Sequence, residues 1–327
     1  MISLNEFLVN KKITNKIDNY AYHPNTTEEL ISNIKKLLNQ DIHDLNCIDT
    51  SNITDMSRIF YDIYINDIDD IDISNWDVSK VENMSHIFYG CRNFNCDISG
   101  WNVSNVTNMT SMFYDCENFN CDISNWNVSK VKDMRYAFHN CKKFNQSLNN
   151  WNVSNVENMS GIFHGCKKFN KPLDKWNVSK VKYIDSMFSN CIKFNQNLNS
   201  WNVSRVIDMK YMFNNCNKFD KPLNKWNVSN VEIMNNMFAG CENFNQPLND
   251  WDVSKVRNME QMFEDCNSFN KPLDKWNVSN VKNMKNMFSY CIKFNQLLDS
   301  WNVNKNVTTI DFMFNWCNNL QKLPYWY

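Results

Sequence analysis

The sequence predicts an α/β solenoid: a stack of about eleven coils, each with one short parallel strand and one short helix. The main observation is a fixed period, because tryptophans recur every 25 residues from Trp76 to Trp301. Phenylalanines keep this step from Phe88 to Phe288, and cysteines keep it from Cys91 to Cys291. Such a period is typical of repeat architectures, in which each coil contacts its neighbours and all coils share one core.

The coil that begins at Trp201 shows why a strand and a helix are expected in each repeat. Trp201 and Val203 alternate with polar residues, which is the spacing of a strand. Val206, Met209 and Phe213 recur at intervals of three and four residues, which is the spacing of an amphipathic helix. The return to the next tryptophan is then a loop.

A serine stands between the expected strand and the expected helix, where a helix N-cap belongs. In three copies a glutamate three residues later would complete a capping box, at Ser79–Glu82, Ser154–Glu157 and Ser229–Glu232. Parallel strands lie about 4.8 Å apart, whereas packed helices need about 8–10 Å. This mismatch predicts a curved, leucine-rich-repeat-like stack with the helices on its convex side.

The two ends depart from the period. Residues 1–44 are expected to form a lead-in and a cap helix, because Thr26 and Glu29 make a capping box before an apolar stripe over residues 26–40. The repeats fill residues 45–319, with a degenerate first copy that ends near Phe60 and one inserted residue near Asn304. Residues 320–327 are expected to close the other end of the stack.

The repeat reads Trp-Asn-Val-Ser-x-Val-x-Asn-Met-x-x-Met-Phe-x-x-Cys-x-x-Phe-Asn and covers nearly the whole chain. It resembles the repeat of the BspA-like leucine-rich-repeat surface proteins, which is abundant in mycoplasma lipoproteins and also occurs in giant viruses. The resemblance implies surface display, adhesion or protein binding, and it implies no shared chemistry. Residues 1–8 carry no basic region, long apolar stretch or lipidated cysteine, a departure that favours an intracellular or virion location.

Composition and motifs argue against several classes of protein. A net charge of -1 among 327 residues disfavours a general nucleic-acid binder. No run of 18 apolar residues could span a membrane. A P-loop, a GxSxG elbow and an HExxH pair are absent, and every candidate serine or aspartate belongs to the repeat. We therefore expect no enzymatic activity and no cofactor.

The periodic tryptophans and cysteines are interpreted as core ladders. Nine of the thirteen cysteines share one position, and helix packing would hold their Cα atoms about 8–10 Å apart, beyond the reach of a disulfide. Cys96 and Cys121 form a shorter second ladder in which free thiols are favoured. The expected core ladders include Trp101, Trp126, Trp151, Trp176 and Trp201, and Cys116, Cys141, Cys166 and Cys191.

Three other patterns have an alternative reading as sites. His139 and His164 each lie two residues before a cysteine, which allows a metal site across two coils, but coincidence is favoured because no Cys-x-x-Cys pair accompanies them. The acidic residues 66–72 could hold calcium, but the EF-hand pattern fails there and a solvated edge is favoured. Asn-Val-Ser matches the glycosylation acceptor, but repeat geometry is the favoured explanation, because the serine is expected to cap a helix. The asparagines that follow the phenylalanine are expected to bond backbone between coils: Asn95, Asn120, Asn145, Asn170, Asn195, Asn245 and Asn270.

The exposed, non-repeating positions are where a solenoid binds its partners. Residues 1–100 carry a net charge of -8 and residues 101–327 one of +7. A 50-residue period places pairs of lysines on every second coil, either as a record of duplication or as a partner-binding edge: Lys171, Lys175, Lys221, Lys225, Lys271 and Lys275. The sequence thus predicts a scaffold for unidentified protein partners. The alternative is a structural or surface-layer component that self-associates head to tail through its charge asymmetry.

Overall fold

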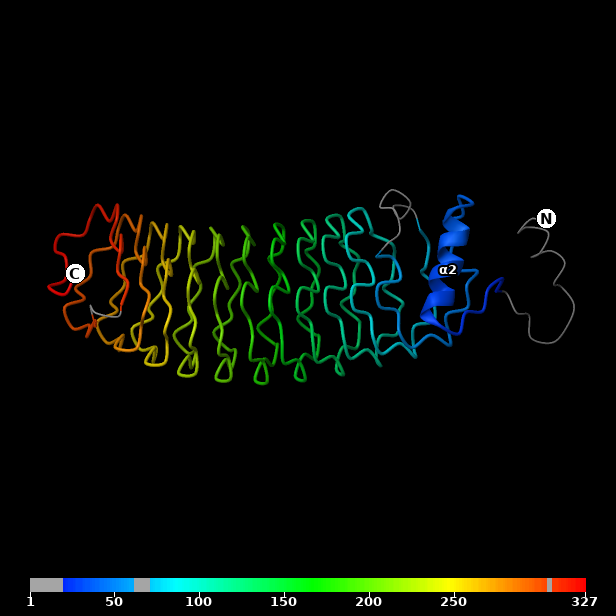
Figure 1. Cartoon of the computed structure of the whole chain (residues 1–327), viewed down its shortest axis with the longest axis horizontal. Helices are drawn as coiled ribbons and strands as arrows, with labels where there is room; N and C mark the ends of the chain where they lie inside the picture. Colours follow the sequence, from blue (N-terminus) through cyan, green and yellow to red (C-terminus); the bar gives the residue numbers. More distant parts are fainter. Residues whose placement is uncertain (1–19, 62–70, 305–307) are drawn as a thin grey trace, which may run out of the picture.

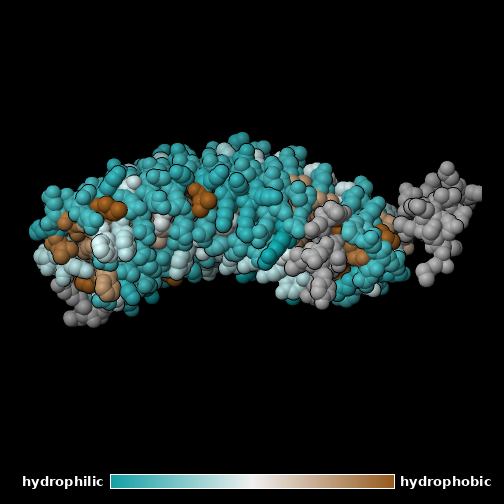
Figure 2. Space-filling view, turned by 90° about the horizontal axis from the view of Figure 1, so that it is seen from above, coloured by the Kyte–Doolittle hydropathy of each residue, from teal (hydrophilic) through white to brown (hydrophobic). Residues whose placement is uncertain are grey.

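The computed structural model describes residues 20–61, 71–304 and 308–327. These residues form a long stack of coils whose first described residues and whose C-terminus lie at opposite tips (Figure 1). The body bows along its length, and the face seen in Figure 2 is mostly hydrophilic. Two segments discussed from the sequence, residues 1–8 and residues 66–70 of the acidic stretch, lie outside the described ranges.

One α-helix, α2 (Thr27–Leu38), is present in the described ranges, and it lies at the N-terminal end of the stack (Figure 1). Thr26 is its N-cap, as the sequence predicts, because the Thr26 side chain accepts a hydrogen bond from the Glu29 N–H at 3.2 Å. The second bond of the predicted capping box is shifted by one residue, since the Glu29 carboxylate accepts from the Asn25 N–H at 2.7 Å. Leu30, Ile34 and Leu37 on its inner stripe are fully buried in the core that the coils share. The helix therefore caps the apolar interior that the first coil would otherwise expose.

The helix expected in every coil is absent from the described residues, so that prediction is wrong. Residues 206–216 form a series of turns, in which Tyr211 and Asn215 have φ angles of 56° and 57°. An α-helix cannot include such left-handed residues. The N–H groups of Met209 and Phe213 donate to carbonyls of the next coil, those of Ile233 and Met237, at 3.0 and 2.9 Å. A helix would have bonded them within its own turn.

The helical spacing of apolar residues has a different cause in this fold. Successive turns close with N–H to C=O bonds three residues apart, as from Met212 to Met209 and from Cys216 to Phe213. Each turn returns the chain to the core after three or four residues, and the apolar residues therefore follow the same spacing as in a helix. The convex layer of helices that would have curved the stack is likewise absent from the described residues.

The parallel strand was predicted in the wrong part of the coil. Counting each tryptophan as the first position, residues 201–203 belong to no β-bridge, and in the coils that begin at Trp76 to Trp276 the bridges lie at the eighth position. Asp208, for example, bridges in parallel to Tyr183 and to Ile233. The corners explain the shift: the Trp201 N–H donates to Leu198 and the Val206 N–H to Val203, so neither is free to pair between coils.

The serine at the fourth position caps no helix. Instead, the Ser204 N–H donates to Asn202 Oδ1 at 3.1 Å, and the same bond recurs in the other Asn-Val-Ser copies. This is an Asx-turn, in which the asparagine side chain closes the corner. The predicted capping boxes at Ser79, Ser154 and Ser229 are therefore wrong, because the turn leads to the eighth-position bridge and not into a helix.

Stacked rings and thiols fill the interior. The five tryptophans from Trp101 to Trp201 are 3–4% exposed. Trp201 lies between Trp176 and Trp226, with ring centroids 6.4 Å away on both sides, and its Nε1 donates to Leu173 O at 2.9 Å. Cys116, Cys141, Cys166 and Cys191 are fully buried.

All thirteen cysteines are free thiols. The sequence favours free thiols because helix packing would hold the cysteine Cα atoms too far apart for a disulfide. That explanation is wrong, because no helices lie between the described coils. From Cys116 onward, each buried thiol instead donates to a carbonyl of a neighbouring coil, as Cys191 Sγ does to Phe163 O at 2.9 Å. Burial raises the pKa of the Cys91 thiol to about 12.

A ladder of asparagine side chains binds the coils together at the twentieth position, as the sequence predicts. The Asn195 N–H donates to Asn170 Oδ1 at 2.9 Å, and the Asp220 N–H donates to Asn195 Oδ1 at 3.0 Å. Asp220 continues the ladder by accepting from the Asn245 N–H at 3.0 Å. At this corner the main chains of adjacent coils do not pair directly. A side-chain oxygen is therefore the acceptor for the backbone N–H, in place of a backbone carbonyl.

Candidate functional site

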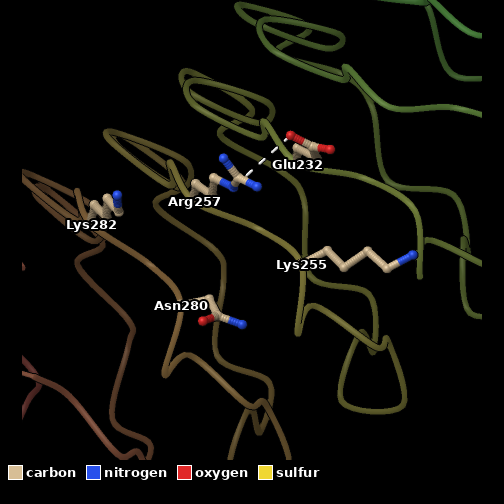
Figure 3. Close-up of a pocket in the computed structure, with 5 residues that line it drawn as sticks. All are labelled: Glu232, Lys255, Arg257, Asn280 and Lys282. Atoms are coloured by element: carbon tan, nitrogen blue, oxygen red, sulfur yellow. Dashed lines mark ion pairs between the residues drawn. The ribbon is translucent and has the colours of Figure 1, made fainter.

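A shallow groove follows one side of the stack across five coils. It consists of two adjoining hollows of about 430 Å³ each. We call it the basic groove, and the residues that line it are Lys182, Arg205, Ile207, Asn230, Glu232, Lys255, Arg257, Asn280 and Lys282. Figure 3 shows the second hollow, where Glu232, Arg257 and Lys282 form one row of side chains and Lys255 and Asn280 form another.

The two rows come from the fifth and seventh positions of successive coils. The sixth position is a buried valine, such as Val256, which fastens this stretch to the core. Its neighbours on either side, Lys255 and Arg257, therefore project outward. The seventh-position N–H donates to the seventh-position carbonyl of the preceding coil, as from Arg257 to Glu232 and from Lys282 to Arg257. Backbone pairing thus sets the spacing of the groove.

Asparagines fix the fifth-position row. Asn230 Nδ2 donates to Ser204 O at 2.8 Å, and Asn230 Oδ1 accepts from Lys255 Nζ at 2.6 Å. Asn280 Nδ2 repeats the first of these contacts with Ser254 O at 2.7 Å. Asn230 therefore bridges the coil before it and the lysine after it, which holds the Lys255 ammonium group at the rim of the groove.

Positive charge prevails along the groove. Glu232 is the one acidic residue that lines it, and its carboxylate lies 4.0 Å from Arg257 Nε. Both side chains of this pair are about half exposed or more, so the pair is weak. Lys182 pairs with Glu157 outside the lining at 3.6 Å. Arg205, Lys255 and Lys282 form no ion pair with any described residue, and their charges remain available to a partner.

The six lysines predicted as a partner-binding edge lie elsewhere on the coil, at the twenty-first and twenty-fifth positions. Lys171, Lys221 and Lys271 are half-buried, whereas Lys175, Lys225 and Lys275 are exposed. None of the six lines the basic groove. Lys275 Nζ lies 2.7 Å from Asp250 Oδ1 of the preceding coil, and Lys175 Nζ donates to Asn150 Oδ1 at 3.4 Å. The role of these lysines in binding a partner stays a prediction.

The basic groove was missed at the sequence level, although a signal for it existed. Basic residues flank the sixth-position valine in three copies, at Lys130 and Lys132, Lys180 and Lys182, and Lys255 and Arg257. Aligning the copies by tryptophan would have shown these pairs as one exposed row. Assigning the same positions to the start of a helix concealed the alternation that turns both side chains outward.

The repeat also decides the family. The family described as "Mycoplasma protein of unknown function, DUF285" matches at residues 5–66, 64–159, 137–248 and 211–326. The chain belongs to this family. Four overlapping matches along its length agree with a repeat solenoid, and the DUF285 description assigns no function. None of the curated proteins matches the chain.

Among solved structures, the chain is similar to one described as "Crystal structure of TLR13-ssRNA13 complex". The identity is 11% and the TM-score 0.23, with 90% of this chain and 48% of that chain covered. The DUF285 chain therefore spans about half the length of that protein, and the similarity is too low to relate the two folds. No described helix is long and apolar enough to cross a membrane.

Outside the basic groove, a column of stacked rings runs along the fourteenth position of this DUF285 chain. His139 lies between Tyr114 and His164, with centroid distances of 4.2 and 4.4 Å and nearly parallel rings. Cys141 and Cys166 point into the core, where each thiol donates to a carbonyl. The histidines and cysteines are thus on opposite sides of the chain, and the described residues hold no group of three candidate metal ligands.

The acidic row near the first coils is held by turns. The Asp72, Asp97 and Asp122 carboxylates each accept the N–H of the serine two residues later at 2.9–3.0 Å. Hydrogen bonds from Ser74 lower the pKa of Asp72. Each carboxylate closes an Asx-turn of the kind that the asparagines form, and this local role explains why aspartate recurs at this position.

We expect a His139→Tyr variant to resist acid better than the native chain. Burial, with a contribution from His164, lowers the pKa of His139 to about 4, whereas the unfolded value is near 6.5. The unfolded chain therefore binds the proton first, and stability present above pH 6.5 is lost as pH falls towards 4. Tyrosine occupies the same position at Tyr89 and Tyr114, so the column accepts it.

Thermal melts between pH 7 and pH 4 test this expectation. The midpoint of the variant should fall less steeply with decreasing pH than that of the native chain, while the two agree more closely near pH 7. Equal slopes would contradict the assignment of acid sensitivity to His139.

Proposed function

We propose that this chain is a non-enzymatic scaffold that binds protein partners, and that it is related to the BspA-like surface proteins through its repeat. The observation that carries the proposal is the basic groove. The repeated residues are buried in one continuous core, whereas the residues that differ between copies form an exposed, charged and shaped surface. Solenoids that bind other macromolecules typically combine a buried core of repeated residues with an exposed surface of residues that vary between copies.

The chemistry of the repeat supports a non-catalytic role. The cysteines at the sixteenth position are buried and carry pKa values raised by burial, which disfavours the reactive thiolate. The recurring serines sit in Asx-turns beside asparagines. Neither set is arranged beside a general base, as an activated nucleophile requires.

An affinity pull-down from native lysate, read by mass spectrometry, tests the proposal. The groove variant carries Lys182→Glu, Lys255→Glu and Lys282→Glu, and the edge variant carries Lys175→Glu, Lys225→Glu and Lys275→Glu. The two variants change the net charge equally, and all six lysines are exposed, so both should fold. A protein captured by the native chain and the edge variant but lost with the groove variant is the expected result.

The other outcomes are also informative. Loss with the edge variant alone would move the binding surface to the lysines predicted from the 50-residue period. If neither variant loses a protein that the native chain captures, or if nothing is captured, the scaffold proposal is contradicted.

Self-association is the second candidate function. The charge asymmetry favours it, because residues 1–100 carry -8 and the remainder +7. Recovery of the chain alone in the pull-down, together with an oligomer that dissociates on dilution and at high salt in sedimentation experiments, would support it. A monomer at high concentration and low salt would exclude it.

A further inference from the structure

We infer that the basic groove binds an extended, acidic polypeptide segment that carries an apolar side chain. The inference rests on the proposed scaffold function and names the chemistry of its partner. Three features of the groove support it: its charge, its length and repeat, and the neutral groups that lie among its cations.

The charge of the groove requires an anionic partner. Of its nine lining residues, Lys182, Arg205, Lys255, Arg257 and Lys282 are basic, and Glu232 alone is acidic. All six are exposed, so a partner can reach them without any rearrangement of the core. Lys180 adds a cation to the first coil of the groove, and Lys130 and Lys132 occupy the same two positions two coils earlier, beyond a coil that carries Asn155 and Glu157 there. Opposite charge along such a surface aligns a partner and speeds its association.

The length and repeat of the groove suit an extended chain. The coils are joined by parallel bridges, for which the strand spacing is about 4.8 Å, so five coils span roughly 20 Å. An extended polypeptide rises about 3.3 Å per residue, and alternate side chains face the same way about 6.6 Å apart. About six residues would fill the groove, with three side chains turned towards the cations.

The neutral groups favour a polypeptide over a nucleic acid. Asn280 Oδ1 accepts no hydrogen bond from the described residues, whereas the equivalent oxygen of Asn230 accepts from Lys255. Among the described residues it is an open acceptor for a backbone N–H, a donor that the sugar–phosphate backbone of DNA lacks. Ile207 in the seventh-position row is 36% exposed and offers a contact for an apolar side chain.

The groove also lacks what single-stranded nucleic acids need. Sequence-tolerant binding of such strands depends on aromatic side chains on which the bases stack. No aromatic residue lines the groove in the described part of the chain.

Fluorescence anisotropy with defined probes tests the inference on the full chain. The probe is a labelled ten-residue peptide of aspartate and glutamate with one central leucine. The controls are its Asn/Gln counterpart and a ten-nucleotide oligothymidine. We expect the acidic peptide to bind about tenfold more tightly than either control, and to weaken as salt is raised.

The variants locate the binding. The groove variant should weaken peptide binding about tenfold or more, and the edge variant by less than about threefold, because its lysines lie outside the groove. Glu232→Gln removes the one opposing carboxylate and should tighten binding about two- to fivefold. Unchanged thermal melts for each variant would show that folding is not the cause.

Several results would overturn the inference. Oligothymidine that binds as tightly as the peptide would make the groove a nucleic-acid surface. Equal losses in the groove and edge variants would reduce the effect to overall charge. If the peptide fails to bind while the groove variant still loses a captured protein, the inference fails and the scaffold function stands.

Discussion

Replacing Trp201 with alanine should lower the free energy of unfolding by about 3–5 kcal/mol, the usual cost of removing a large buried aromatic side chain. The ring is 3% exposed and is stacked between Trp176 and Trp226 at 6.4 Å on each side. The variant also loses the hydrogen bond from Trp201 Nε1 to Leu173 O. Its effect should extend to both neighbouring coils, because each coil is stabilised mainly by contact with the next.

Urea unfolding followed by circular dichroism measures this effect. The chain offers a matched control in Trp316, which is 59% exposed and touches Tyr290 on the surface. Trp316→Ala should cost less than about 1 kcal/mol. A cost below about 1 kcal/mol for Trp201→Ala would refute the buried tryptophan ladder, whereas a broadened transition would show that the coils beyond the cavity unfold separately.

Removing one asparagine from the inter-coil ladder should cost about 1–3 kcal/mol. Asn195→Ala deletes the Oδ1 atom that accepts from the Asp220 N–H at 3.0 Å, and it leaves that part-buried donor without its partner. The Asn195 N–H keeps its own bond to Asn170 Oδ1. The damage is therefore confined to one contact between two coils.

Asn195→Asp is the control for this prediction, because Asp220 already fills the ladder position and accepts from the Asn245 N–H at 3.0 Å. A carboxylate supplies the same acceptor, so this variant should unfold within about 0.5 kcal/mol of the native chain near pH 7. If the alanine variant is equally stable, water satisfies the Asp220 N–H and the ladder contributes little. If the aspartate variant is as unstable as the alanine variant, the amide group and not its oxygen is what the coil needs.

Local features of the fold were predictable wherever local chemistry determines them. Thr26 is the N-cap of α2 as expected, since its bond from the Glu29 N–H depends on residues three apart. The asparagine ladder was predictable because a polar side chain at one repeat position must meet its own copy in the next coil. The basic groove was not predicted, because reading the fifth and seventh positions as the start of a helix obscured which side chains face outward together.

The sequence by itself determined the period, the solenoid architecture and the cap helix. It did so because a 25-residue coil cannot bury its apolar face except against another copy. Only the tertiary structure decided what backbone each coil adopts. Val206, Met209 and Phe213 have the same spacing in a helix and in a series of three-residue turns, so apolar periodicity cannot distinguish them. The turns form because the Met209 and Phe213 N–H groups find carbonyls in the next coil. Those partners lie about one repeat away in sequence, and only stacking of the coils brings them into contact.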